Sequence, residues 1–209
     1  MRKMNAILKQ GRKLVEDNTL LKILQSEISH EISNPRFQNV ETGSLGDFKV
    51  DWDSPVNRDV VLKRRFDSGE EVVVSALLRQ EPIKEEDVLA FPREALAKVC
   101  IKKPGISSVM LFDCQVFETK RGNSDFDIER ARFIRSLVSP PRSSRYGEEE
   151  FYRSLDYKLQ DAMKEYIRSK GFSEGLTNFL LCHLNKKEQD QYVNWLRKLE
   201  STMSNSLKP

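Results

Sequence analysis

The hydrophobic period of this chain changes twice along its length, and this limits its possible folds more than any other feature. From Asp17 to Ser33 apolar residues recur at every fourth position, which predicts one amphipathic helix over 17–33. Between residues 46 and 135 the period is two, which is typical of strands. From residue 148 to 204 the helical period returns. The sequence therefore predicts an α+β fold in the order helix, sheet, helices.

The predicted strands follow one another through tight turns, which indicates an antiparallel meander. In the first strand Phe48, Val50 and Trp52 alternate with acidic residues, so we expect a half-buried strand with Asp51 and Asp53 on its polar face. The residues from Val109 to Phe117 are apolar on both sides and predict a central strand.

The closing helices have recognisable termini. The helix that begins at residue 148 opens on three glutamates and stops at Gly171, and a short helix is expected after Ser173. Asn185 with Glu188 three residues later reads as a capping box that opens a last helix.

Length and charge favour one domain with a mixed surface. The 209 residues predict a single domain over 17–204, preceded by a short basic N-terminus over 1–16 and interrupted by a linker at 138–146. The net charge of +3 is too balanced to make nucleic-acid binding the leading hypothesis, although residues 119–145 alone carry an excess of four positive charges.

The cysteines and the N-terminus bear on the compartment. Three cysteines without CxxC spacing argue against a disulfide framework or zinc site and favour a reducing compartment. No run approaches the roughly 18 apolar residues of a membrane span, so we expect no membrane insertion. The first fifteen residues contain five basic and no acidic side chains, which is the charge bias of a mitochondrial presequence.

The chain lacks the motifs that carry catalysis in common enzyme classes. There is no glycine-rich phosphate loop, no nucleophile elbow and no HExxH motif, and only His30 and His183 are present. Cys182 and His183 are helical neighbours that point about 100° apart, so they do not form a nucleophile and base. Asp51 and Asp53 are an alternative acid-base or cation pair, which a solvated strand face explains more simply. We expect no catalytic residue, cofactor or metal.

Three groups of residues are candidates for interactions. An acidic insertion is a candidate docking loop, arginines after the last predicted strand are a candidate phosphate-contacting patch, and apolar side chains of the terminal helices are candidates for helix or subunit packing. These groups are, in turn, Glu81, Glu85, Glu86 and Asp87; Arg130, Arg132 and Arg135; and Leu24, Ile28, Tyr192, Trp195 and Leu196.

The C-terminal block from Tyr146 to Leu199 carries a family resemblance. It contains Leu155-Asp156, Lys158-Leu159-Gln160, the helix end from Tyr166 to Gly171, Leu176-Thr177-Asn178-Phe179-Leu180, Lys187-Glu188 and Gln191-Tyr192-Val193-Asn194-Trp195-Leu196. Together with the stretches Leu20 to Ile28 and Phe126-Asp127-Ile128, this block resembles the mitochondrial glycoprotein family, and its plant members in particular.

The resemblance implies a twisted antiparallel sheet of about seven strands, flanked by one N-terminal helix and two to three C-terminal helices, in a ring-shaped homotrimer. It also implies a non-enzymatic scaffold or chaperone of the mitochondrial matrix. Such a protein binds itself and other matrix proteins, and supports mitochondrial translation, ribosome assembly or respiratory function.

This chain departs from the family pattern in its charge and its leader. The family is strongly acidic, whereas this chain has a net charge of +3 and an acidic insertion of only four carboxylates. Its short leader keeps the cytoplasm and nucleus open as alternative locations. The alternative function is an RNA-binding or ribosome-associated module that uses the basic stretch 120–145.

Overall fold

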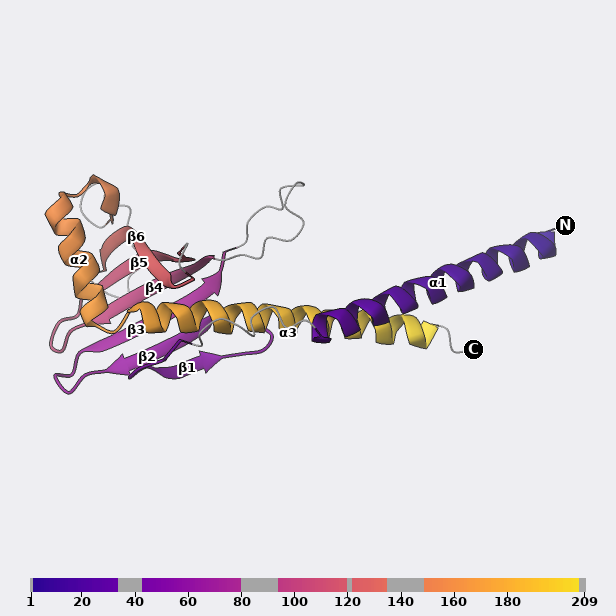
Figure 1. The fold of residues 1–209 in the computed structure, drawn as a ribbon, viewed down its shortest axis with the longest axis horizontal. Coiled ribbons are helices and arrows are strands. Elements are labelled where there is room, and N and C mark those ends of the chain that lie inside the picture. Colours follow the sequence, from indigo (N-terminus) through magenta and orange to yellow (C-terminus); the bar gives the residue numbers. More distant parts are fainter. Residues whose placement is uncertain (1, 34–42, 80–93, 120–121, 135–148, 207–209) are drawn as a thin grey trace. The chain divides into compact units, whose positions relative to one another are not determined.

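The computed structural model describes residues 2–33, 43–79, 94–119, 122–134 and 149–206. The elements are α1 (Arg2–Ser33), β1 (Lys49–Asp53), β2 (Val60–Arg65), β3 (Glu71–Leu78), β4 (Glu94–Lys102), β5 (Val109–Glu118), β6 (Ser124–Ile134), β7 (Glu149–Phe151), a 3₁₀ turn (Tyr152–Ser154), α2 (Tyr157–Ser169) and α3 (Glu174–Ser206). This is the predicted α+β order of helix, antiparallel sheet and helices (Figure 1).

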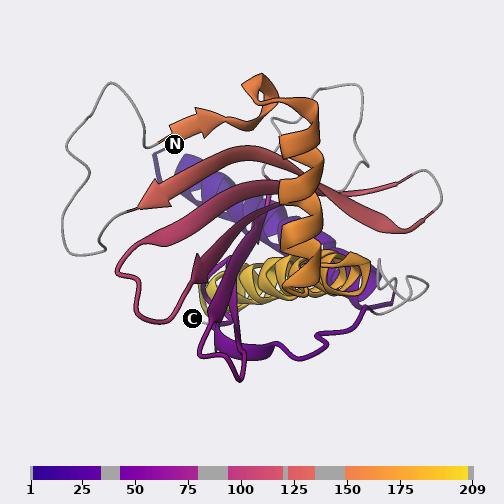
Figure 2. The ribbon, with the colours of Figure 1, turned by 90° about the vertical axis from the view of Figure 1, so that its left-hand side faces the viewer.

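The sheet is a meander in which each strand pairs with the next in the chain. Its order is β1-β2-β3-β4-β5-β6-β7, and every pairing is antiparallel. The six strands from β1 to β6 form its body, and the three-residue β7 pairs with β6 at one edge. β5 has a neighbour on each side, which confirms the predicted central strand. The strands fan out, each rotated relative to the next, as in a twisted sheet (Figure 2).

One face of the sheet, called here the core face, is covered by helices. Alternate residues of β2 to β6 point to it and are almost fully buried, as period-two patterning requires. Ile167 of α2 and Leu176, Leu180 and Leu184 of α3 close the core above them. α2 crosses the strands rather than following them (Figure 2). The opposite face is called the outer face.

The chain divides into two compact units. The sheet unit is Asn39–Asn185, and the helix unit is Met1–Gln38 with Lys186–Pro209. In the helix unit Leu24, Ile28 and Leu196 are buried together, with Tyr192, Leu199 and Met203 packed against them. The predicted single domain over 17–204 stays a prediction.

The predicted helix over 17–33 is too short, because α1 begins at Arg2. The residues predicted to form a separate basic N-terminus are helical in backbone, since no proline interrupts them and a single glycine, Gly11, costs only about 1 kcal/mol in a helix. The apolar stripe is buried at Leu24 and Ile28, but Leu20 and Ile32 at its ends are exposed.

The start of the second helical region was also predicted wrongly. Residues 149–151 form β7 rather than the first turn of a helix, because they pair with Arg130 to Arg132 at the sheet edge. α2 begins at Tyr157, where the Asp156 carboxylate accepts a hydrogen bond from the backbone N–H of Lys158 at 2.9 Å. The predicted linker at 138–146 lies outside the described residues.

The predicted capping box at Asn185 is wrong, because α3 runs without a break from Glu174 to Ser206. Asn185 is buried inside the helix, and its side-chain amide donates to the carbonyl oxygen of Leu181, one turn earlier, at 2.8 Å. This hydrogen bond to the preceding turn gives the buried Asn185 amide a partner without ending the helix. The two predicted helices after Ser173 are therefore one.

Candidate functional site

A β-bulge in β1 rearranges the residues that the sequence placed on one face. The pairing register shifts between Val50 and Trp52, so Trp52 lies opposite Val61 and Asp53 opposite Val60. Strict alternation therefore fails here, and the prediction that Asp51 and Asp53 share a face is wrong. The predicted half-burial is correct for Phe48, which lies just before β1 and is buried, but wrong for Val50 and Trp52, which are exposed.

The bulge turns Asp53 toward α3, where it meets a histidine. The Nε2 atom of His183 lies 2.8 Å from Oδ2 of Asp53, and the imidazole stacks on Phe179 with ring centroids 5.3 Å apart. His183 therefore pairs with a carboxylate of the edge strand and not with its neighbour Cys182. Burial raises the pKa of the Cys182 thiol, which keeps it protonated and unreactive at neutral pH.

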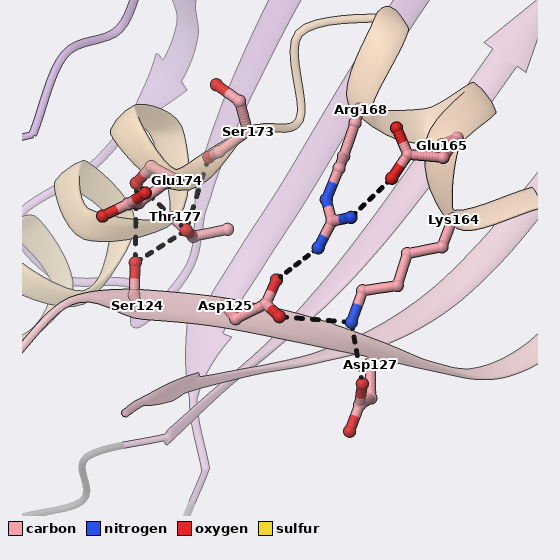
Figure 3. Close-up of polar contacts among 9 residues, drawn as sticks. All are labelled: Ser124, Asp125, Asp127, Lys164, Glu165, Arg168, Ser173, Glu174 and Thr177. Atoms are coloured by element: carbon pink, nitrogen blue, oxygen red, sulfur yellow. Dashed lines mark hydrogen bonds and ion pairs between the residues drawn. The ribbon is translucent and has the colours of Figure 1, made fainter. Parts of the chain in front are cut away.

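Charged side chains gather where α2 passes β6 (Figure 3). The Lys164 ammonium lies 3.2 Å from Asp125 and 3.1 Å from Asp127, and the Arg168 guanidinium lies 3.1 Å from Asp125 and 2.6 Å from Glu165. Burial pushes the pKa of Asp125 upward, but the Phe126 N–H, Arg168 and Lys164 outweigh it and hold the pKa below its usual value. The cluster is an ion-pair network that ties the helix to the strand.

A surface hollow of about 660 Å³ lies beside this network, at the start of α3. Ser124, which lines the hollow, forms a buried hydroxyl pair with Thr177, with Ser124 Oγ and Thr177 Oγ1 2.7 Å apart. Thr177 also contacts the carbonyl oxygens of Ser173 and Glu174 (Figure 3). The lining residues are Thr119, Asn123, Ser124, Asp125, Arg168, Ser173 and Glu174. Asp125 and Arg168 already form an ion pair with each other at 3.1 Å.

A further group of charged and polar side chains fixes the C-terminal end of α2. The Lys170 ammonium lies 2.7 Å from the buried Glu70 carboxylate, which also accepts a hydrogen bond from the Tyr166 hydroxyl at 3.2 Å. Burial and the Glu70 charge raise the pKa of Tyr166 to about 12, so this phenol stays a donor at all physiological pH values. The cluster binds a helix to the β2–β3 turn.

Only two of the three arginines of the predicted basic patch lie within the described residues. Arg130 and Arg132 lie opposite Asp113 and Leu111 on the outer face, and Arg132 forms an ion pair with Asp113. Arg135 and the acidic docking loop, residues 81–87, lie outside the described residues.

Among the described residues no group of His, Cys, Asp and Glu is placed to hold a metal ion. No helix within that same part of the chain is long and apolar enough to cross a membrane.

The predicted packing residues meet in the helix unit. Leu24 and Ile28 of α1 pack on Leu196 of α3, and the Tyr192 hydroxyl donates to Glu27 at 3.2 Å. Trp195 stacks on Tyr192 at 6.0 Å and yet is 54% exposed.

Sequence reasoning missed the His183–Asp53 pair and the α2–β6 network. Lys164 and Arg168 are four residues apart on one helix face, and Asp125 and Asp127 alternate on one strand, so each half of the network had a local signal. Nothing local showed that these halves meet.

Comparison with known proteins decides the family. The family model described as mitochondrial glycoprotein matches residues 24–203, which is most of the chain. The chain belongs to the mitochondrial glycoprotein family. Among curated relatives, the mitochondrial acidic protein mam33 of Schizosaccharomyces pombe is 29% identical over 119 residues, 51% of this chain and 42% of that protein. An uncharacterized mitochondrial protein of Arabidopsis thaliana is 23% identical over 201 residues, 91% of this chain and 76% of that protein.

Solved structures of two other proteins show the same fold. A hypothetical protein of Leishmania major, described as a sequence homologue of human p32, superposes with a TM-score of 0.66 at 18% identity. The p22 protein of Trypanosoma brucei superposes with the same TM-score of 0.66, at 16% identity. Each match covers 90% of this chain and 99% of the other. The likeness establishes the fold of the described elements.

Proposed function

We propose that this chain is a non-enzymatic, homotrimeric scaffold or chaperone of the mitochondrial matrix that supports mitochondrial translation, ribosome assembly or respiratory function. Its membership of the mitochondrial glycoprotein family and the mitochondrial names of its relatives support the compartment. The lack of the sequence motifs that carry catalysis in common enzyme classes favours a binding role over a catalytic one.

The observation that carries the assembly is the apolar surface of the helix unit. Its buried cluster contains only three residues in the described region, whereas Ile23, Ile32 and Trp195 each leave more than half of their surface exposed. Large apolar side chains that continue outward from a small core mark an association surface. A trimer would bury them, and a closed ring would leave none of these surfaces open.

Sedimentation velocity at micromolar concentration tests the trimer. The full chain is expected to sediment as a trimer, and Ile23→Glu with Trp195→Glu to shift it to monomers, because buried unpaired carboxylates are strongly unfavourable. Lys198→Glu, an exposed position on the same helix as Trp195, is the matched control and should leave the trimer intact. A wild-type chain that sediments only as a monomer would exclude this assembly.

Compartment and partners need separate measurements. Protease protection of the tagged full-length protein in isolated mitochondria, with and without outer-membrane rupture, should show a protected matrix species. Affinity capture from the same mitochondria, with and without RNase, separates a protein scaffold from the RNA-binding alternative. Partners that survive RNase support the scaffold, and loss of all partners would support the alternative.

A further inference from the structure

The outer face of the sheet concentrates positive charge. Residues directly opposite each other in an antiparallel ladder point to the same face. On the outer face, one cross-strand row contains Lys49, Lys63 and Arg132, the next contains Lys98 and Arg130, and a third contains Arg65 and Lys102. Of these seven cations, Lys49, Arg65, Lys98, Lys102 and Arg130 are exposed.

Among the described side chains, the acidic residues paired in these rows are Glu71 and Asp113, and two more, Asp51 and Glu129, lie at the bulges of β1 and β6 next to them. Cations therefore outnumber acidic residues in this part of the outer face.

The carboxylates of Glu71 and Asp113 already form ion pairs with cations of these rows. Glu71 lies 3.1 Å from the Lys63 ammonium and 3.0 Å from the Arg65 guanidinium, so one carboxylate serves two cations. Asp113 forms its ion pair with Arg132. Lys49 lies directly opposite Lys63, and like charges in that position destabilise a sheet. An anionic partner on this face would relieve that repulsion.

Beside the cations, β3 and β4 present two aliphatic side chains, in a row that continues to Gln115 and Asp127. Leu77 and Leu96 lie opposite one another on β3 and β4 and are 39% and 36% exposed. β4 presents Leu96, Lys98, Cys100 and Lys102 in alternation, so apolar and cationic positions interleave. Single-stranded nucleic acids bind through bases stacked on aromatic rings. Trp52, 38% exposed, lies in the Lys98 row but on the edge strand β1, whereas β3 and β4 in the middle of the face contain no aromatic residue. The surface suits carboxylates and aliphatic groups better than bases.

We propose that the outer face binds an acidic, amphipathic segment of a partner protein, with carboxylates over the cation rows and apolar side chains over Leu77 and Leu96. The proposal rests on the binding role proposed above but not on the oligomeric state. It assigns this chain a class of partner opposite in charge to those that a strongly acidic protein would attract.

Fluorescence anisotropy with the full chain tests the proposal. The probe is a labelled peptide of about ten residues that alternates Glu and Leu, which spans roughly 33 Å when extended. Two comparison probes are the same peptide with Lys in place of Glu and a uridine oligonucleotide of similar length. The Glu-Leu peptide should bind with an affinity that falls as salt rises, and the Lys-Leu peptide should not bind.

Charge reversal locates the binding site. Lys98→Glu with Lys102→Glu should weaken binding by at least about tenfold, whereas Lys158→Glu with Lys198→Glu, the same charge change on exposed helix positions, should alter it by less than about twofold. Because a carboxylate at position 98 would lie opposite Asp113, Lys98→Gln with Lys102→Gln provides a milder variant if the first does not fold. It should weaken binding in the same direction.

Three results would overturn the proposal. These are equal weakening by both charge reversals, tighter binding of the oligonucleotide with the same dependence on Lys98 and Lys102, and a change of oligomer size in the Lys98 and Lys102 variants, which would assign the face to a second copy of the chain. Sedimentation of the same samples keeps the two hypotheses apart. A monomeric wild type that still binds the acidic peptide would contradict the trimer and support the outer-face site.

Discussion

The sheet unit and the helix unit differ in how completely each buries its apolar side chains. In the sheet unit, strands and helices enclose a continuous core whose largest members, among them Phe126, Phe172 and Leu62, are almost wholly shielded. In the described part of the helix unit, two long helices share a small cluster around Leu196. We expect a unit of the first kind to be stable alone and a unit of the second kind to gain stability from association.

The two tryptophans allow this difference to be measured directly. Trp52 lies in the sheet unit and Trp195 in the helix unit, and the chain contains no other tryptophan. Trp52→Phe and Trp195→Phe therefore leave one fluorescence reporter in each unit. Each prediction below can be followed through both reporters.

The largest effect is expected in the core of the sheet unit. The Phe126 and Phe172 rings meet edge to face at 4.8 Å, and both are almost completely buried. Phe172→Ala removes this contact and leaves a cavity, so the free energy of unfolding should fall by about 3–5 kcal/mol in urea denaturation. Phe133→Ala, at a position that is 47% exposed, is the control and should cost far less. Equal losses would contradict this description of the core.

A backbone contact should give the next largest effect. The segment that enters β1 passes so close to α3 that a Cβ added at Gly43 would overlap the backbone of Gly175 and Phe179. The Ser44 N–H donates to the Gly175 carbonyl oxygen at 2.9 Å at this crossing. Gly43→Ala should therefore cost about 3 kcal/mol, measured by urea denaturation at the Trp52 reporter.

Gly175→Ala is the opposite case at the same crossing. A Cβ at Gly175 would meet atoms of Ser44 only at ordinary contact distance, and alanine favours a helix over glycine by about 1 kcal/mol. This variant should be neutral or stabilising. Similar destabilisation by both substitutions would show that the crossing is looser than described.

Much of this architecture follows from local patterns, and the exceptions have physical causes. The strands around Val74 and Val99 were predictable because apolar residues recur at alternate positions, and the strand around Phe112 because it is apolar on both sides. The bulge at Asp51 was not, because no glycine marks it and only pairing with β2 reveals it. β7 was missed because three successive glutamates also suit the start of a helix.

The candidate site was less accessible to sequence reasoning than the fold. Arg168 and Asp125 are separated by 43 residues, and His183 and Asp53 by 130. Pairs at such separations depend on the topology of the sheet and not on any local period. The packing residues Leu24, Ile28 and Leu196 were predictable as apolar stripes, but their partners across subunits remain a prediction.

An intermediate effect is expected in the helix unit. Leu196→Ala removes a side chain that is 3% exposed and should cost about 2 kcal/mol. If association stabilises this unit, its melting temperature at the Trp195 reporter should fall on dilution, and the variant should steepen that fall. The Trp52 reporter should show no such dependence. A melting temperature of the helix unit that is independent of concentration would remove the distinction between the two units.

The smallest effect is expected at the α2–β6 network, and it should depend on pH. The pKa of Asp125 lies below its usual value of about 3.9, because hydrogen bonds from the Phe126 N–H, Arg168 and Lys164 outweigh the effect of burial. A carboxylate with a lowered pKa stabilises the fold above its unfolded pKa and loses this contribution as pH falls through its folded pKa. Asp125→Asn should therefore cost less than about 1 kcal/mol at neutral pH, since the pair is partly exposed, and nothing well below pH 4. Urea denaturation of both proteins across this range, with Asp161→Asn as a control carboxylate outside the network, measures the difference. A cost that persists unchanged in acid would mean that Asp125 stabilises the sheet unit by packing and not by charge.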